Sequence, residues 1–75
     1  MEYQEFKMTM RSKARLANGL VNLLKDDTKQ MCIDVDDFDM FSLSEAIREA
    51  KRTSQNLIDT IDELDRDLRM VKRDA

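Results

Sequence analysis

Hydrophobic residues in the second half of the chain repeat at the alternating three- and four-residue spacing of a helix that buries one side. The spacing is kept over nine positions, of which only Ser54 is polar. Ser42 and Glu45 stand in the S-x-x-E spacing of a capping box, which marks a helix start. We therefore expect a helix over about residues 42–73. Its apolar row is Leu43, Ile47, Ala50, Ser54, Leu57, Ile61, Leu64, Leu68 and Val71.

A similar but less regular pattern predicts a first helix over about residues 2–25. Lys13 interrupts its apolar stripe, and the pair Asn18-Gly19 is also a turn signal. The apolar spacing continues unchanged beyond this pair, so a continuous helix is favoured over a broken one. Glycine would then allow a neighbouring helix to approach closely. The stripe is made of Tyr3, Phe6, Met10, Ala17, Leu20 and Leu24.

Residues 26–41 have a different pattern, in which Met31, Ile33 and Val35 alternate with polar or small residues. This period of two is typical of a half-buried strand. A segment this short cannot form a sheet by itself. We expect an extended acidic strap over the end of the helical pair, and the alternative is pairing with its copy in a dimer.

The chain has no proline and one glycine, too little turn chemistry for an all-β domain. We therefore predict a single all-α domain over residues 1–75, a long antiparallel helical hairpin with an acidic connecting segment. With these helix bounds, the numbers of facing residues would add up to about 67. This register would bring the cations Lys7, Arg11 and Arg15 near the acids Asp59, Asp62 and Glu63.

A hairpin of this size is expected to be marginally stable. Ordering each residue costs about 1.5 kcal/mol, and one seam between two helices buries little apolar area to offset this cost. Two hairpins that pair their apolar stripes into a four-helix, coiled-coil-like bundle would bury more. We therefore predict a homodimer. Its seam would use Leu57, Ile61, Leu64, Leu68 and Val71.

Composition narrows the function further. The chain has no histidine, so it has no imidazole base and no histidine metal ligand, and we expect no enzyme activity, metal or cofactor. The net charge of −3 argues against direct binding to nucleic-acid phosphates or anionic lipids. A single cysteine, no apolar run long enough for a membrane and no signal-peptide pattern favour a cytoplasmic protein.

The string DVDDFDMF at residues 34–41 interleaves acids with large apolar side chains. It resembles the acidic-aromatic peptides of transcriptional activation segments and of the tails of single-stranded-DNA-binding proteins. The resemblance implies that the acids steer the segment to a basic groove in which the apolar side chains dock. In the alternative, Phe38, Met40 and Phe41 plug the end of the hairpin core. The predicted partner-binding residues are Asp36, Asp37, Phe38, Asp39 and Met40.

These observations favour a small non-catalytic regulator, adaptor or inhibitor that binds another protein stoichiometrically. A second hypothesis is an acidic nucleic-acid mimic, of the kind that phages and mobile elements use as inhibitors, which would occupy a DNA- or RNA-binding groove. A third is a structural subunit of a coiled-coil assembly. The mimic would present Asp59, Asp62, Glu63, Asp65 and Asp67 together with the acidic segment.

Overall fold

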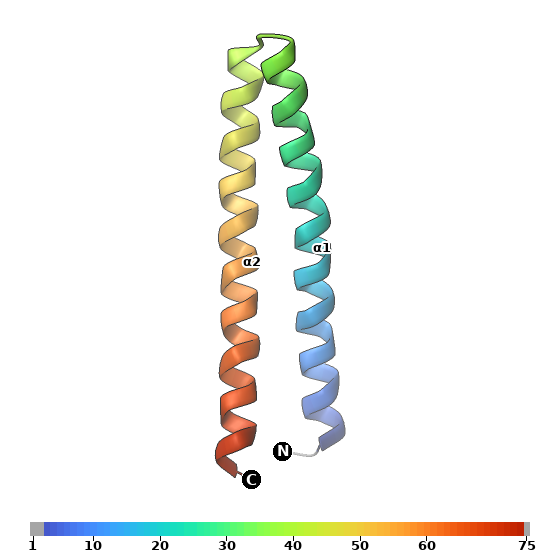
Figure 1. Cartoon of the computed structure of the whole chain (residues 1–75). Helices are drawn as coiled ribbons and strands as arrows, with labels where there is room; N and C mark the ends of the chain where they lie inside the picture. Colours follow the sequence, from blue (N-terminus) through green and yellow to red (C-terminus); the bar gives the residue numbers. More distant parts are fainter. Residues whose placement is uncertain (1–2, 75) are drawn as a thin grey trace.

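The computed structural model of the chain describes residues 3–74, and it describes the side chains of residues 4–70. Two helices, α1 (Tyr3–Asp36) and α2 (Met40–Asp74), run antiparallel to one another. They form a rod whose Cα extents are 55 × 17 × 12 Å (Figure 1). The predicted all-α helical hairpin is therefore confirmed, while residue 2, where the first helix was expected to begin, lies outside the described residues.

Helix α1 extends well beyond residue 25, so the interpretation of residues 26–41 as an extended strap is wrong. Asp27, Met31 and Asp34 continue the heptad spacing of Leu20 and Leu24, and all five are buried or half-buried. The alternation that resembled a strand is a helix with one side turned inward. The connection is three residues long, and two of the three, at positions 37 and 39, are acidic.

Helix α1 is continuous through Asn18-Gly19, as the apolar spacing predicted. Gly19 does not serve a close helix approach, however. A Cβ atom added at this position would meet no other atom within 4 Å. The glycine is therefore an exposed weak point of the helix rather than a packing device.

Three side-chain hydrogen bonds between the helices fix their register. Lys13 Nζ donates to Asp67 Oδ2 at 2.6 Å, Thr53 Oγ1 donates to Asp27 Oδ2 at 3.3 Å, and Ser42 Oγ donates to Asp34 Oδ1 at 2.8 Å. The residue numbers add up to 80 in the first two pairs and to 76 in the third, so the expected sum of about 67 is wrong. The difference arises because α1 ends at Asp36, which moves the connection and all of α2 along the chain.

The seam between the helices uses two heptad rows of α2. The a row holds Leu43, Ala50, Leu57 and Leu64, and the d row holds Ala46, Thr53, Thr60 and Asp67. All of these residues are buried or half-buried, and Thr53 and Thr60 are buried. Half of the seam of α2 is therefore apolar and the other half mostly polar, an arrangement that specifies register at some cost in stability.

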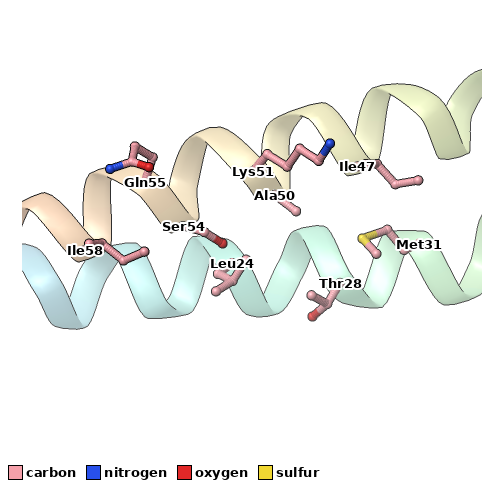
Figure 2. Close-up of a pocket in the computed structure, with 9 residues that line it drawn as sticks. All are labelled: Leu24, Thr28, Met31, Ile47, Ala50, Lys51, Ser54, Gln55 and Ile58. Carbon is pink, nitrogen blue, oxygen red and sulfur yellow. The ribbon is translucent and has the colours of Figure 1, made fainter.

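The apolar stripe predicted on α2 is split between two directions. Its a-row half faces α1, but its other half is the e row, Ile47, Ser54, Ile61 and Leu68, whose three large side chains are exposed. Next to the e row runs a shallow groove between the helices, lined by Leu24, Met31, Ala50 and Ser54 among others (Figure 2). Of the predicted dimer-seam residues, Leu57 and Leu64 therefore lie in the seam within the hairpin. Ile61 and Leu68 are exposed, and the side chain of Val71 lies outside the described residues.

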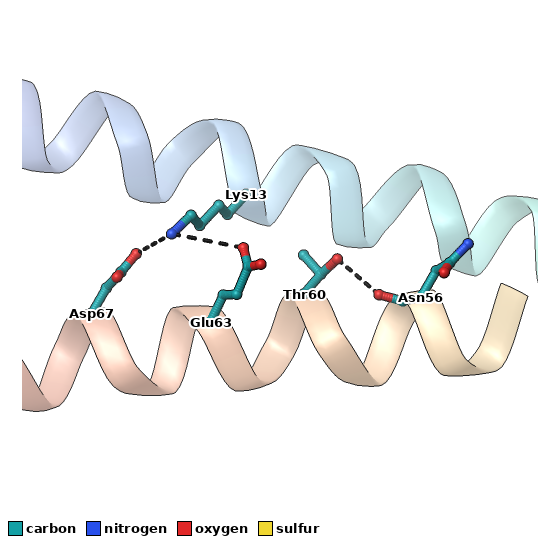
Figure 3. A network of polar contacts seen from close by, with 5 residues as sticks. All are labelled: Lys13, Asn56, Thr60, Glu63 and Asp67. Carbon is teal, nitrogen blue, oxygen red and sulfur yellow. Dashed lines mark hydrogen bonds and ion pairs between the residues drawn. The ribbon is translucent and has the colours of Figure 1, made fainter.

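Lys13 makes the cross-helix ion pairs found among the described residues, with Asp67 at 2.6 Å and Glu63 at 3.8 Å (Figure 3). The pairing predicted for Lys7, Arg11 and Arg15 is not formed, because the register brings other residues opposite them. Lys13, which interrupts the apolar stripe of α1, is instead a member of the seam and fixes its open end.

Lys13 gives the fold a pH dependence at alkaline pH. Its pKa is raised above the usual value, first by the hydrogen bond to Asp67 and then by the charges of Asp67 and Glu63. The stabilising contribution is fully present below the unfolded-state value of about 10.4 and is lost as pH rises through the higher folded-state pKa. In urea unfolding, the wild type should exceed Lys13→Gln in stability from about pH 7 to 10, and the difference should shrink above about pH 11.

Lys7→Gln is the matched control, because Lys7 is an exposed lysine of the same helix. Its difference from the wild type should stay nearly constant over this pH range. A Lys13→Gln difference that follows the same course as that of Lys7→Gln would show that the ion pair does not contribute to stability.

Candidate functional site

The tip of the hairpin, residues 36–41, is the candidate site, and its backbone is a compact helix-ending motif. The Phe38 N–H donates to the Val35 carbonyl at 3.2 Å, and the Asp39 N–H donates to the Asp34 carbonyl at 2.9 Å. Phe38 has a φ of 57°, in the left-handed region. Together these features form a Schellman motif, in which the left-handed position is usually glycine. A phenylalanine there costs conformational energy.

Asp39 starts the second helix. Its Oδ1 accepts the Ser42 N–H at 3.1 Å, and its carbonyl accepts the Leu43 N–H at 3.0 Å. These are the bonds of an N-cap residue, so α2 begins at Met40 and the predicted capping box at Ser42 is wrong. The sequence assigned Asp39 to partner binding, and in the structure its carboxylate caps the first turn of α2.

A buried carboxylate joins the two helices directly below the tip. Asp34 is 3% exposed, and its Oδ1 accepts hydrogen bonds from Ser42 Oγ at 2.8 Å and from Gln30 Nε2 at 2.9 Å. Its second oxygen, Oδ2, has no protein partner. The sequence pattern missed this residue as a structural anchor. Its place at the heptad spacing of Leu20 and Asp27 is the signal that could have indicated it.

Large apolar side chains at the tip are turned to solvent. Phe38 is 83% exposed, Phe41 is 78% exposed, and Met40 is also exposed. The alternative in which these three side chains plug the end of the hairpin core is therefore wrong. Asp36 and Asp37 are exposed beside them. The structure thus brings all five predicted partner-binding residues together on an accessible tip, with Asp39 also capping α2. It adds Phe41, which belonged to the acidic-aromatic string but not to the predicted binding residues.

No protein-family model, curated protein or solved structure matches this chain. The chemistry of the site must therefore be inferred from its own side chains.

The tip offers hydrophobic contact and negative charge. Among residues 3–74, no three histidine, cysteine or carboxylate side chains converge closely enough to hold a metal ion. Over the same stretch, neither helix has the apolar length that crossing a bilayer requires. Two accessible aromatic rings among carboxylates are suited to docking on a surface that combines an apolar pocket with a basic rim.

Proposed function

We propose that this chain is a non-catalytic protein that binds a partner protein through the tip of its hairpin. It would act stoichiometrically as a regulator, adaptor or inhibitor. Phe38 and Phe41 are the anchors, Met40 extends the apolar contact, and the carboxylates of Asp36 and Asp37 orient the approach. The observation that supports this proposal best is the exposed ring of Phe38 on a left-handed backbone position.

Folding does not explain a phenylalanine at this position. The left-handed conformation is unfavourable for a residue with a β-carbon, and the exposed ring recovers little energy through packing. Strained residues at exposed positions are typical of sites that contact ligands or partners. A ring held on a short connection between two long helices also loses little conformational entropy when it binds.

The acids of the tip contribute to how a partner is approached. Asp36, Asp37 and Asp39 place three carboxylates within four residues, and only Asp39 is engaged as a helix cap. Rim charges of this kind mainly raise the association rate and select partners of opposite charge. We infer a partner groove with an apolar floor and lysine or arginine residues at its edge.

The nucleic-acid mimic has less support. Several of the acids that it requires on α2 already have partners: Glu63 and Asp67 pair with Lys13, Asp65 pairs with Arg69 at 2.8 Å, and Asp59 accepts a bond from Gln55. A mimic needs a row of carboxylates with phosphate-like exposure. The acids of α2 are interrupted by Arg66 and Arg69, and Asp67 is half-buried, so they do not form such a row.

Site-specific photo-crosslinking in an extract of the native host tests the proposal. A photoreactive phenylalanine analogue at Phe41 should form one discrete adduct with another protein, and excess unlabelled wild-type chain should suppress this adduct. The variant Phe38→Ser/Phe41→Ser should fail to suppress it. The matched control carries the same analogue at Met8, an exposed residue on α1 far from the tip, and should give no such adduct.

Two results would contradict tip binding. One is an identical set of adducts from positions 8 and 41, and the other is equal competition by the wild type and the double serine variant.

The salt dependence of binding distinguishes the two function hypotheses, because a mimic loses affinity steeply as ionic strength rises. Docking by aromatic anchors should leave the dissociation rate nearly unchanged by salt.

A further inference from the structure

One side of the hairpin carries an apolar surface that the chain does not cover. We define the outer face as the e row of α2, together with Ile58 of α2 and Val21 of α1. Ile61 is 50% exposed, and Val21, Ile47, Ile58 and Leu68 are also exposed. Within residues 4–70, Ala46 is the one buried apolar residue. The apolar stripe of α2 is thus divided: one row packs against α1, and the other lies on the outer face.

The accessible area shows how much of this surface is in excess. The chain exposes 6223 Å². A compact monomer of 8.8 kDa would expose about 4,800 Å², so the excess is about 1,400 Å². In a standard protein interface each partner buries about 800 Å². The surplus is therefore large enough for a stable interface along the rod.

The opposite edge of the seam is less suited to be covered. Leu16 and Leu23 are exposed there on α1, but the g row of α2 carries Glu49, Asn56 and Glu63. Burying these polar groups against an apolar layer would be costly. The outer face is therefore the side that a second layer covers.

We propose that the occupant of the outer face is a second copy of this chain, packed so that the two α2 helices are antiparallel. The face is self-complementary about Ile58. Lys51 and Asp65 each lie seven residues from Ile58, so the pairing places Lys51 of each copy beside Asp65 of the other. Asp65 pairs with Arg69 through Oδ2, and its side chain is 51% exposed, which leaves Oδ1 to accept Lys51. A twofold interface requires this kind of internal match.

The shape of the outer face has the same symmetry. Ser54 and Ala50 are small, and they border the groove in the half of the rod nearer the tip (Figure 2). Ile61 and Leu68 project from the other half. Ile61 lies three residues after this centre and Ser54 lies four residues before it, so Ile61 of one copy comes within one residue of the level of Ser54 of the other, and each groove receives an isoleucine. On α1, Val21 lies level with this centre in the register set by Lys13 and Asp67.

The antiparallel arrangement uses the charge of Lys51 better than a parallel one. If both tips pointed the same way, α2 of one copy would lie on α1 of the other at the same level. Cross-helix hydrogen bonds join residues whose numbers add up to between 76 and 80, so Lys51 would lie level with residues 25–29, which hold two lysines and two aspartates. The antiparallel arrangement instead gives each Lys51 a partner of opposite charge, Asp65 of the other copy.

Sedimentation equilibrium with charge-reversed variants tests the proposal. The wild type should be a dimer at micromolar concentration. Lys51→Glu and Asp65→Lys should each weaken self-association about tenfold, because each change turns two attractive pairs into repulsive ones. An equimolar mixture of the two variants should form a heterodimer as tight as the wild-type dimer, and the double variant Lys51→Glu/Asp65→Lys should also recover wild-type affinity.

Two matched controls separate the outer face from general effects. Arg52→Glu makes the same charge change at the next residue, on the other side of α2, and should dimerise like the wild type. Ile61→Ser should be monomeric at about 100 µM, whereas Leu23→Ser, an equally exposed position on the opposite edge, should not. If a single variant is poorly folded, recovery of helicity on mixing it with its complement gives the same information.

The proposal is overturned by a wild type that stays monomeric at about 100 µM, by failure of the mixture to pair, or by a Lys51→Glu dimer that is tighter than the wild-type dimer. Self-association and tip binding use different residues, so the two proposals fail separately. Ile61→Ser tests self-association without changing the tip, and the serine variants at Phe38 and Phe41 test the tip without changing the outer face.

Discussion

Replacing Asp34 with alanine should lower the free energy of unfolding by about 2 kcal/mol, the largest loss expected from a single truncation here. The carboxylate links α1 to the first turn of α2 through Ser42, and it also accepts a bond from Gln30. Hydrogen bonds to a charged group are worth about 1.5–3 kcal/mol each. The loss is partly offset, because alanine removes the burial cost of the unpartnered Oδ2.

Asp34→Asn is the informative control. It keeps an acceptor oxygen for Ser42 and removes the buried charge, so its stability should stay within about 1 kcal/mol of the wild type. Ser42→Ala should lose about half as much stability as Asp34→Ala, and the two alanine changes should not be additive because they remove a shared bond. Urea unfolding should be followed by circular dichroism at one fixed chain concentration, since self-association stabilises the fold. If Asp34→Ala is as stable as Asp34→Asn, the bonds to Asp34 do not hold the tip.

The sequence pattern predicted the helices of this fold better than their pairing. The four- and three-residue spacing from Leu43 onward identified α2, because apolar periodicity is a direct consequence of burying one side of a helix. The same pattern did not identify Asp27 and Asp34 as seam residues, because it follows apolar positions and both residues are polar, although they keep the heptad spacing. Their polarity is compensated by Thr53 and Ser42 on the other helix, and such partners become visible only when the register is known.

The error in the first helix has a physical cause. Met31, Ile33 and Val35 satisfy the period of a strand locally, but a helix also accommodates them when Met31 turns inward and the two β-branched residues face solvent. Alternation over a few residues is a weaker signal for secondary structure than a heptad pattern that continues from the preceding twenty residues. Because the register depends on where α1 ends, this one error also displaced every predicted cross-helix ion pair.

The candidate site was predictable in composition but not in conformation. The acids and aromatic residues of the tip are adjacent in sequence, so a short connection between helices must display them. That Phe38 occupies a left-handed position, and that Asp39 rather than Ser42 caps α2, depends on the last turn of α1. The partner-binding hypothesis became more specific when the plug alternative failed, because the rings then had no partner within the described part of the chain.

Phe38→Gly should stabilise the hairpin by about 1 kcal/mol while it weakens partner binding. Glycine adopts the left-handed conformation without a steric cost, whereas a residue with a β-carbon pays about 1–2 kcal/mol, part of which is offset by the greater freedom of glycine in the unfolded chain. The exposed ring contributes little packing energy that would be lost. In a domain of this size the midpoint of thermal unfolding should rise by about 4–8 °C.

Phe38→Ala separates the backbone from the ring, because it removes the aromatic group and keeps the unfavourable left-handed β-carbon. Its stability should stay close to that of the wild type, and its loss of partner crosslinking should match that of Phe38→Gly. Equal stability of the alanine and glycine variants would show that the left-handed turn is not populated in solution. A glycine variant that is more stable and binds less would show that the tip gives up folding energy to present a ring, which is the behaviour expected of a binding residue.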